Sequence, residues 1–413
     1  MEGVKEINKK AVLVPKLRFK DFSDSWKKVN LGDLGETIGG LTYSPDDVTN
    51  NGTLVLRSSN IQEDNLSFED NVFVEVQPDD FNPVKENDIL ICVRNGSKNL
   101  IGKNVIIPKS IEGVAFGAFM SVYRSKNNNF IIHYLKTNSY KKQVHKNLGA
   151  TINSINGSDL KKFKLNIPSL PEQEKIAAFL TAVDEKIQQL NRKKQLLEQY
   201  KKGLMQQLFS GKLSFKDENG KAYPKWEEKK LGEIAERVVR KNKEDNQNVL
   251  TISAQQGLVS QLEYFNKSVS AKDVTNYYLL LKDEFAYNKS YSAGYPMGAI
   301  KRLNRYEKGV VSTLYICFKF KDCVSLEFME QYFENGDQNF EIEKVAQEGA
   351  RNHGLLNIGV NDFFNINLKL PSKEEQKKIA DFLSAIDIKI NGVAAALEAT
   401  TQFKKGLLQQ MFV

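Results

Sequence analysis

Cysteine and histidine are scarce in this sequence, which has 3 of each among 413 residues. The cysteines form no Cys-x-x-Cys pair and lie in apolar or strand-like stretches, so we predict reduced core residues rather than a disulfide framework or a zinc site. The histidines are scattered, and none stands beside a nucleophile or a carboxylate pair. The sequence therefore predicts neither a metal site nor histidine-based catalysis. The residues concerned are Cys92, Cys317, Cys323, His133, His145 and His353.

Long apolar runs are also missing. Near the N-terminus only Ala11 to Val14 is continuously apolar, which is far shorter than the core of a signal peptide. No later stretch approaches the roughly 20 apolar residues that cross a bilayer as a helix. We expect a protein that enters no membrane and resides in the cytoplasm.

The motifs of nucleotide hydrolysis and of methyl transfer to a base are absent as well. There is no Gly-x-x-x-x-Gly-Lys-Ser/Thr phosphate loop, no Gly-x-Gly-x-x-Gly turn, and no Asn-Pro-Pro-aromatic or Asp-Pro-Pro-aromatic tetrapeptide. We recognise no cluster of carboxylates and no activated nucleophile. We therefore predict a chain that is not an enzyme by itself and has no catalytic, cofactor-binding or metal-binding residues.

What remains is an ordinary globular composition with a basic excess. Hydrophobic residues make up 41% of the chain, charged residues make up 27%, and the formal net charge is +8. The length favours two or three domains. A positive net charge permits a polyanionic partner, but it is weak evidence alone because many folded proteins are mildly basic.

The chain contains an internal duplication. The tryptophan segment recurs with an offset of 226 − 26 = 200 positions, and a proline-led segment recurs with an offset of 371 − 168 = 203 positions. The two tryptophans of the protein lie one in each copy of the tryptophan segment. The matching segments are Lys16–Asp21 and Lys212–Asp217, Trp26–Leu34 and Trp226–Ile234, Pro168–Leu180 and Pro371–Leu383, and Lys201–Phe209 and Lys404–Phe412.

Two inserts lie between these repeated frames. The first insert, residues 35–166, and the second insert, residues 235–369, are similar in length but share little obvious identity. Random divergence after duplication is one explanation, although it should lower the sequence identity of the repeated segments and of the inserts alike. Because the repeated segments remain similar while the inserts do not, the pattern favours inserts selected for different targets.

Each half ends in a predicted long helix. From Glu172 to Phe209 there is no proline and one glycine, and apolar residues alternate at spacings of four and three, interrupted only by Lys194 and Lys201. The second copy continues the same heptad register because 203 is a multiple of seven. Helices of about 57 Å need a partner, so we predict an antiparallel coiled coil related by an internal pseudo-two-fold. Gly203 and Gly406 indicate a close helix crossing or a docking site for a partner, unless they are merely tolerated.

The inserts have the pattern of mixed α/β domains with irregular sheets, in which short β-like runs alternate with polar loops. In the first insert we predict strands at Thr53–Leu56, Val72–Val76, Asp88–Val93, Asn104–Ile107 and Phe119–Tyr123. In the second insert we predict them at Val249–Ile252, Tyr277–Leu281, Glu284–Tyr287 and Val310–Phe320.

Several loops of the inserts combine the side chains that bind base edges and phosphates. Arginine can pair with guanine, asparagine and glutamine can pair with adenine, and lysine and serine can contact phosphate. Any one loop is weak evidence because solvated loops have the same composition. The candidate DNA-binding residues are Arg57, Ser58, Ser59, Asn60, Arg94, Asn95, Ser97, Lys98, Asn99, Lys146, Thr151 and Asn153 in the first insert, and Gln255, Gln256, Asn288, Lys289, Ser290, Tyr291, Ser292, Lys301, Arg302, Arg305, Arg351, Asn352 and His353 in the second.

Together these features resemble the specificity subunits of type I restriction-modification enzymes, whose halves each contain a variable target recognition domain followed by a long helix. The resemblance covers the whole chain. It rests on Trp26 and Trp226 with the Leu-Gly pair that follows each, on the Pro-x-x-x-Glu-Gln-x-x-Ile-Ala motif at 168–177 and 371–380, and on the Lys-Lys-Gly-Leu helix ends.

The fold that the resemblance implies is of the α+β class: two mixed α/β target recognition domains separated by two long helices in an antiparallel coiled coil, with an internal pseudo-two-fold duplication. We expect the first recognition domain with its N-terminal frame at residues 1–166 and the first helix at 167–210. A linker plus the second recognition domain should follow at 211–369, and the second helix at 370–413.

The resemblance also implies a role. Each domain would read one half of an asymmetric bipartite site in double-stranded DNA, while the helix pair would set the spacer and dock two methyltransferase subunits, joined by restriction/translocase subunits. S-adenosylmethionine, ATP and magnesium are then expected on the partners and no cofactor in this chain. Two alternatives remain on the sequence alone: a coiled-coil scaffold for proteins without specific DNA binding, and a self-contained DNA-modifying enzyme. A complex that only methylates would fit the sequence equally well.

Overall fold

The computed structural model describes residues 13–148, 153–253, 256–265, 273–292, 294–346 and 356–413. The chain forms two compact units: unit 1 comprises residues 1–191 and 395–413, and unit 2 comprises residues 192–394. Each unit therefore contains one insert and one end of each long helix. Among the described residues, no helix combines the length and the apolarity needed to cross a membrane.

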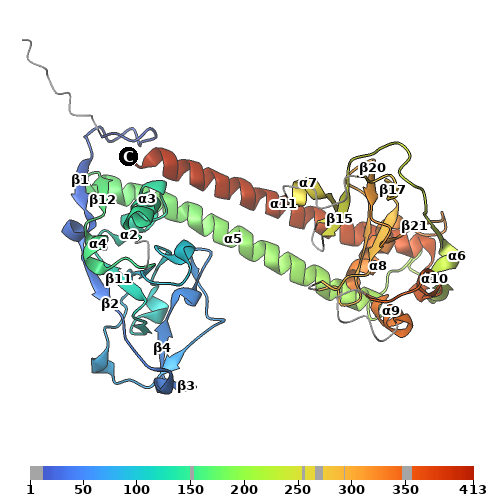
Figure 1. The fold of residues 1–413 in the computed structure, drawn as a ribbon, viewed down its shortest axis with the longest axis horizontal. Coiled ribbons are helices and arrows are strands. Elements are labelled where there is room, and N and C mark those ends of the chain that lie inside the picture. The colour runs from blue at the N-terminus through green and yellow to red at the C-terminus, as the bar shows by residue number, and fades with distance from the viewer. Residues whose placement is uncertain (1–12, 149–152, 254–255, 266–272, 293, 347–355) are drawn as a thin grey trace, which may run out of the picture. The chain divides into compact units, whose positions relative to one another are not determined.

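Unit 1 is built on a four-stranded antiparallel sheet of order β2-β11-β8-β9, of which Figure 1 labels β2 and β11. Every residue of β8 and the first four residues of β11 are buried, as expected for central strands; β8 is an uninterrupted apolar run, whereas β11 also buries Ser121. A second sheet has the order β10-β4-β7-β3. The strands are β1 Lys27–Asn30, β2 Glu36–Gly39, β3 Val48–Thr49, β4 Thr53–Leu56, β5 Ile61–Gln62, β6 Asn65–Leu66, β7 Phe73–Val74, β8 Ile89–Cys92, β9 Asn104–Ile106, β10 Ala115–Phe116, β11 Met120–Arg124 and β12 Lys164–Ile167.

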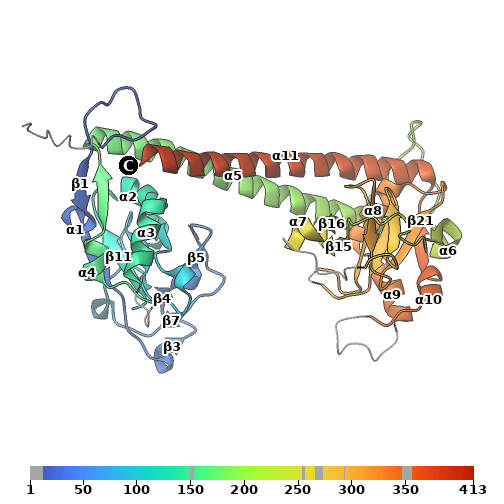
Figure 2. The same ribbon diagram turned by 45° about the horizontal axis from the view of Figure 1, so that its top comes forward.

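Three helices follow β11: α2 (Asn128–Tyr134), α3 (Asn138–Asn147) and α4 (Gly157–Lys161). The Thr137 hydroxyl caps α3 by accepting from the Tyr140 amide, and the Asn156 side chain caps α4. The strand before the first insert, β1, runs antiparallel to β12 at the end of the insert, as labelled in Figure 1 and seen from another side in Figure 2. This ribbon closes the insert where its two chain ends meet.

Unit 2 repeats this arrangement in the same order. Its main sheet is β14-β21-β18-β19, its ribbon pairs β13 with β22, and α8, α9 and α10 take the places of α2, α3 and α4. Smaller pairs join β15 to β16 and β17 to β20. The strands are β13 Glu227–Lys230, β14 Ala235–Arg237, β15 Leu250–Ser253, β16 Gly257–Ser260, β17 Tyr278–Leu281, β18 Phe285–Asn288, β19 Ala299–Arg302, β20 Lys308–Val311, β21 Ile316–Phe320 and β22 Asn367–Leu370. The helices are α6 Leu231–Ile234, α7 Gln261–Phe265, α8 Leu326–Asn335, α9 Asn339–Val345 and α10 Val360–Phe364.

The two inserts therefore share a fold that their sequences conceal. Even the turn before the central strand is the same. Asp88 accepts from the amide three residues earlier at 2.8 Å, and Glu284 does so at 2.9 Å. The residue before each acid, Asn87 or Asp283, has a positive φ of 64° or 72°. The predicted internal duplication is confirmed and extends into the inserts.

The Leu-Gly pair of the frame marks a short helix that packs under each insert. In unit 1 this helix is α1 (Leu31–Leu34), and α6 replaces it in unit 2. Leu31 and Leu231 are buried. A Cβ at Gly32 would lie 3.0 Å from the Cβ of Lys161, and one at Gly232 would lie 3.2 Å from the carbonyl oxygen of Phe364. Glycine permits this close approach of α4 or α10, which explains its presence in both copies.

Two helices of 40 and 39 residues carry the predicted heptads: α5 (Leu170–Phe209) and α11 (Lys373–Met411). In unit 1 the start of α5 shares a core with the end of α11, which contributes Leu407 and Met411. In unit 2 the end of α5, with Met205 and Leu208, shares a core with the start of α11. Opposite helix ends thus meet in each unit, which confirms the antiparallel pairing.

Aromatic residues of the frame attach each helix end to its unit. Trp26 packs against Phe412 with ring centroids 6.3 Å apart, and Trp226 packs against Phe209 at 6.1 Å. Each phenylalanine lies five residues after the leucine of a Lys-Lys-Gly-Leu motif. Further upstream, Phe19 meets Phe179 and Phe215 meets Phe382. The repeated motifs are therefore packing partners of one another.

The Glu-Gln pair of the frame fixes the start of each helix. The Gln173 amide donates to the Pro168 carbonyl, and Gln376 donates to Pro371, both at 3.0 Å. Each glutamine oxygen also accepts from the insert: from the Asn127 side chain in unit 1 and from the Ser325 amide in unit 2. Both side chains are buried, so these bonds orient the helix relative to its sheet.

Three expectations need correction. Cys323 is exposed, whereas Cys92 and Cys317 are buried, and burial raises the pKa of those two thiols to about 11 and about 12. The predicted strand Val310–Phe320 is two strands, β20 and β21, separated by a turn. A Cβ on Gly203 or Gly406 would meet no described atom within 4 Å, so no close helix crossing occurs at these glycines.

Candidate nucleic-acid interface

In unit 1, three of the predicted loops converge beyond the end of β8. The Asn95 side chain donates to the Ser58 hydroxyl at 3.0 Å, and the Asn95 amide donates to the Asn153 carbonyl at 3.3 Å. The Asn153 side chain in turn donates to the Gly96 carbonyl at 2.9 Å. Ser58 follows β4 and Asn153 precedes α4, so residues far apart in the sequence form one surface. We name the residues 57–59, 94–99, 119 and 153 the unit 1 loop cluster.

Arg94 is the cation at the centre of this cluster. It is exposed and forms no ion pair with any described residue, and its guanidinium carbon lies 5.7 Å from the centroid of the Phe119 ring. Phe119 is 57% exposed, although the sequence pattern assigned it to a strand. The glycine just upstream in Gly117-Ala118-Phe119 is the sequence signal that could have placed it in a turn. An exposed ring beside an unpaired arginine can contact a thymine methyl group or a base face.

Asn60 and Arg57 shape the loop after β4. Asn60 is fully buried, and its amide donates to the Ser67 carbonyl at 3.0 Å and to the Asn71 side chain at 3.1 Å. Arg57 pairs with Asp70 at 2.9 Å. DNA contact by Asn60 remains a prediction, and its burial argues against it. The neighbouring Ser59 is half-buried.

The other candidates of the first insert lie at the surface. Ser97, Lys98 and Asn99 are exposed in the turn after Arg94, and Lys146 is exposed near the end of α3. Thr151 lies outside the described residues. Because the four described side chains are exposed, their contact with DNA stays a prediction that the geometry permits.

In unit 2, the loop after β18 occupies the place of the Arg94 loop. The Asn288 side chain accepts from the Ser290 amide at 3.1 Å, and the Lys289 carbonyl accepts from the Leu356 amide at 3.0 Å. Lys289 forms no ion pair with a described residue, and Tyr291 is 66% exposed. Ser292 is half-buried in the same loop. We name residues 288–292 the unit 2 loop.

Lys301 and Arg302, by contrast, already have protein partners. Lys301 Nζ lies 2.9 Å from the Tyr295 hydroxyl and pairs with Glu334. Arg302 pairs with Asp283 at 2.6 Å and with Glu327 at 2.9 Å. Burial, with a further contribution from Glu334, raises the pKa of Tyr295. These carboxylates neutralise both cations and lower their value for phosphate binding.

The remaining candidates of the second insert are divided between exposed and undescribed positions. Arg305 is exposed without an ion pair to a described residue, and Gln256 is exposed in the turn between β15 and β16. Four candidates lie outside the described residues: Gln255, Arg351, Asn352 and His353. The structure thus brings together the loops of unit 1 and leaves part of the second set without a described position.

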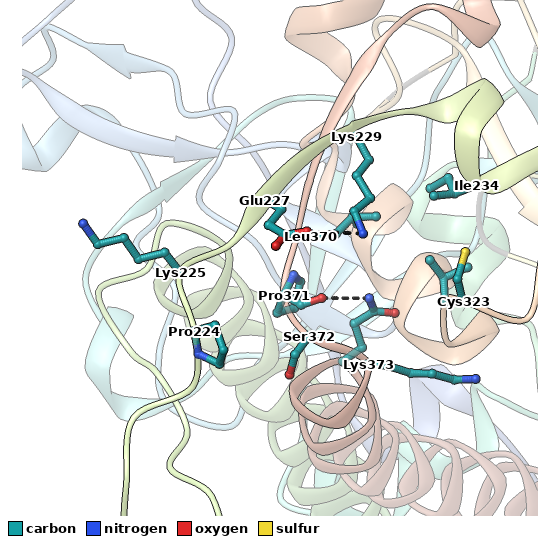
Figure 3. Close-up of a pocket in the computed structure, with 12 residues that line it drawn as sticks. Pro224, Lys225, Glu227, Lys229, Ile234, Cys323, Leu370, Pro371, Ser372 and Lys373 are labelled. Carbon is teal, nitrogen blue, oxygen red and sulfur yellow. Dashed lines mark hydrogen bonds and ion pairs between the residues drawn. The ribbon is translucent and has the colours of Figure 1, made fainter.

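Unit 2 also contains a pocket of about 260 Å³ on its frame rather than on its loops (Figure 3). It lies between the ribbon, the residues before β13 and the start of α11. Lys229 Nζ lies 3.3 Å from a carboxylate oxygen of Glu227 on the same strand, and Gln376 uses both polar atoms in the helix-start bonds described above. None of the candidate DNA-binding residues lines this pocket. In the described part of the chain, no three His, Cys, Asp or Glu side chains are placed to hold a metal ion.

A family model described as the type I restriction modification DNA specificity domain matches residues 23–199 and again residues 223–399. The two matches coincide with the two halves of the duplication. Each match contains the tryptophan segment, an insert and most of a long helix.

Individual relatives are named as specificity subunits of type I restriction enzymes. The chain is 28% identical over 229 residues to the "Type I restriction enzyme StySPI specificity subunit" of Salmonella potsdam, covering 51% of this chain and 48% of that protein. It is 28% identical over 214 residues to the EcoKI specificity subunit of Escherichia coli (strain K12), covering 48% and 45%. The aligned region thus spans about half the length of these curated relatives.

Among solved structures, the fold is similar to that of a type I restriction-modification S subunit from M. genitalium. The TM-score is 0.59 at 17% identity, and the match covers 97% of this chain and 99% of the other. At this identity the likeness concerns the fold alone. It extends over both units and both long helices.

Proposed function

The chain belongs to the type I restriction modification DNA specificity domain family, and from this membership we propose that it is the non-catalytic DNA-recognition subunit of a type I restriction-modification complex. Each unit binds one half of a bipartite target through its loops. The observation that carries the proposal is the repetition of one specificity-domain fold with two differently built loop surfaces. Because the surfaces differ, the target is asymmetric.

Unpaired cations and exposed aromatic rings support DNA as the ligand of the loops. Arg94 and Lys98 in unit 1 and Lys289 and Arg305 in unit 2 form no ion pair with a described residue. Phe119 and Tyr291 add large exposed rings beside them. Basic side chains supply salt-dependent affinity, while neighbouring amide, hydroxyl and ring groups supply base discrimination.

The proposed complex contains further subunits. Two methyltransferase subunits dock on the frame, restriction/translocase subunits join them, and the helix pair sets the spacer between half-sites. S-adenosylmethionine, ATP and magnesium belong to those partners. The repeated frame surfaces support two equivalent docking positions, because α5 and α11 present the same Lys-Lys-Gly-Leu sequence with open space at Gly203 and Gly406.

Methylome sequencing tests this function. The chain is expressed with its cognate methyltransferase subunit in a host that lacks its own methyltransferases, and the subunit alone is the control. We expect a methylated, asymmetric, split motif only when this chain is present. A stable complex that produces no new methylation would contradict the proposal and favour a protein scaffold.

A further inference from the structure

Each unit contains a polar junction where both long helices meet a helix of the insert. In unit 2, Lys201 Nζ of α5 lies 2.7 Å from Asp387 Oδ1 of α11. The Gln331 amide of α8 donates to the other oxygen of Asp387 at 2.9 Å. Asp387 thus joins the two long helices and the second insert.

Unit 1 contains the same junction with the two long helices exchanged. Lys404 of α11 pairs with Asp184 of α5, and His133 Nδ1 of α2 lies 3.7 Å from Asp184 Oδ2. His133 Nε2 also lies 3.2 Å from the Thr181 hydroxyl of α5. The two ion pairs are related by the duplication, because 387 − 184 and 404 − 201 both equal 203.

Both lysines stand at heptad positions where the other residues are mostly apolar and face the partner helix; we call this row of positions the apolar seam. Lys201 follows Leu197 by four residues and precedes Leu204 by three, and Lys404 has the equivalent place between Thr400 and Leu407. Their side chains are only 14% and 15% exposed. A charge at such a position usually weakens a coiled coil and persists where it specifies register or orientation.

Alternative registers of the helices would break both ion pairs. A shift of one heptad keeps apolar seam against apolar seam, but it places Asp184 opposite Leu397 or Met411 instead of Lys404. The same shift places Lys201 opposite Ala380 or Ala394 instead of Asp387. Parallel helices in equal register would set Lys201 against Lys404, which repel each other. Of these arrangements, only the observed antiparallel register places each of the four charged side chains beside an opposite charge.

We propose that the Lys201–Asp387 and Lys404–Asp184 pairs determine the register of the long helices, and that Gln331 and His133 transmit this register to the inserts. These are positioning residues, since none of them lies in the loops that face DNA. The functional consequence, which rests on the proposed function, is that the pairs set the spacer length that the subunit accepts.

A charge-swap cycle in the full-length chain tests the pairing without DNA. Lys201→Asp places like charges together, so we expect a lower Tm than wild type. Adding Asp387→Lys restores opposite charges and should recover most of the loss. Failure of the second substitution to rescue the first would overturn the pairing, whatever the protein's function.

A second experiment separates register from stability. The variant Lys201→Leu, Lys404→Leu, Asp184→Ala, Asp387→Ala replaces both pairs by apolar groups, which offsets the loss of the Asp387 acceptor by Gln331, so we expect only a small change in Tm. It is assayed with the methyltransferase subunit on duplexes that carry the wild-type half-sites with the natural spacer or three base pairs more or less, because a one-heptad shift of about 10 Å corresponds to roughly three base pairs. We expect the preference for the natural spacer to fall at least about tenfold, because the shifted registers no longer bury unpaired charges.

The matched control is Lys194, another lysine of the apolar seam, whose ion pair lies within one helix and so does not depend on the register between the helices. Lys194 pairs with Glu198 of its own helix at 3.3 Å. The variant Lys194→Leu, Glu198→Ala should keep the wild-type spacer preference. An unchanged preference in the four-residue variant would overturn the inference, whereas a wild-type complex that methylates no split motif would instead refute the proposed function.

Discussion

His133 and Gln331 occupy equivalent places in the two units, but only the histidine titrates. Burial, reinforced by the charges of Lys404 and Lys136, lowers the pKa of His133 to about 3. The unfolded chain binds a proton below its ordinary pKa of about 6.5, whereas the folded chain resists this proton until about pH 3. The contribution of neutral His133 to stability is therefore complete above pH 6.5 and is lost as the pH falls toward 3.

The substitution His133→Gln, which introduces the side chain found in unit 2, should remove this pH dependence. Wild type should lose about 2 kcal/mol of unfolding free energy through His133 between pH 7 and pH 5. Urea denaturation at the two pH values measures the difference. His145→Gln, at an exposed position, is the control. Equal losses in wild type and His133→Gln would show that another group is responsible.

Arg94 and Arg302 carry the same charge but should behave differently. Arg94→Gln removes an unpaired cation from the unit 1 loop cluster, so the slope of log K against log salt should become shallower by about 1. Arg302→Gln should change the slope less, because Asp283 and Glu327 already neutralise Arg302. Binding of the assembled complex to its target at several salt concentrations measures both slopes. A slope unaffected by Arg94→Gln would assign Arg94 to the ordinary surface.

At the scale of secondary-structure elements, α5 and α11 suit a spacer because each is one continuous helix, of 40 and 39 residues. Seven residues inserted into each helix, after Asn191 and after Ala394, keep the seam in phase and add about 10 Å to each. We expect a target with unchanged half-sites and a spacer longer by about three base pairs, at roughly 3.4 Å per pair. Methylome sequencing gives the new motif. Altered half-sites would contradict the separation of spacing from recognition.

The elements also show what sequence patterns can predict. The long helices were predictable because heptads and repeated motifs are local signals, and α5 begins at Leu170, two residues before the expected Glu172. The division of Val310–Phe320 into two strands was missed because the turn contains no glycine or proline and Ser312 is its only typical turn residue. Cys323 was assigned to the core from its apolar neighbours, but it lies in the turn between β21 and α8.

At the scale of the whole molecule, the repeated sequence segments predicted the duplication, whereas the sequence predicted the candidate interface only in part. The sequence named Ser58, Asn95 and Asn153 separately, and only tertiary structure brings them together. It could not anticipate that Glu334 of α8 neutralises Lys301, because those residues are far apart in the chain. The likeness of the two inserts was hidden for the same reason: topology persisted while identity was lost.

The two units differ in how the chain composes them. Unit 2 is a continuous segment, whereas unit 1 is completed by residues 395–413, whose Leu407 and Met411 join its core and whose Phe412 packs on Trp26. During synthesis on a ribosome, unit 1 therefore cannot complete its core until residues 395–413, which follow unit 2 in the sequence, have been translated. A nascent chain exposes the incomplete core of unit 1 while unit 2 folds, and a prematurely terminated chain would lack a finished first recognition domain.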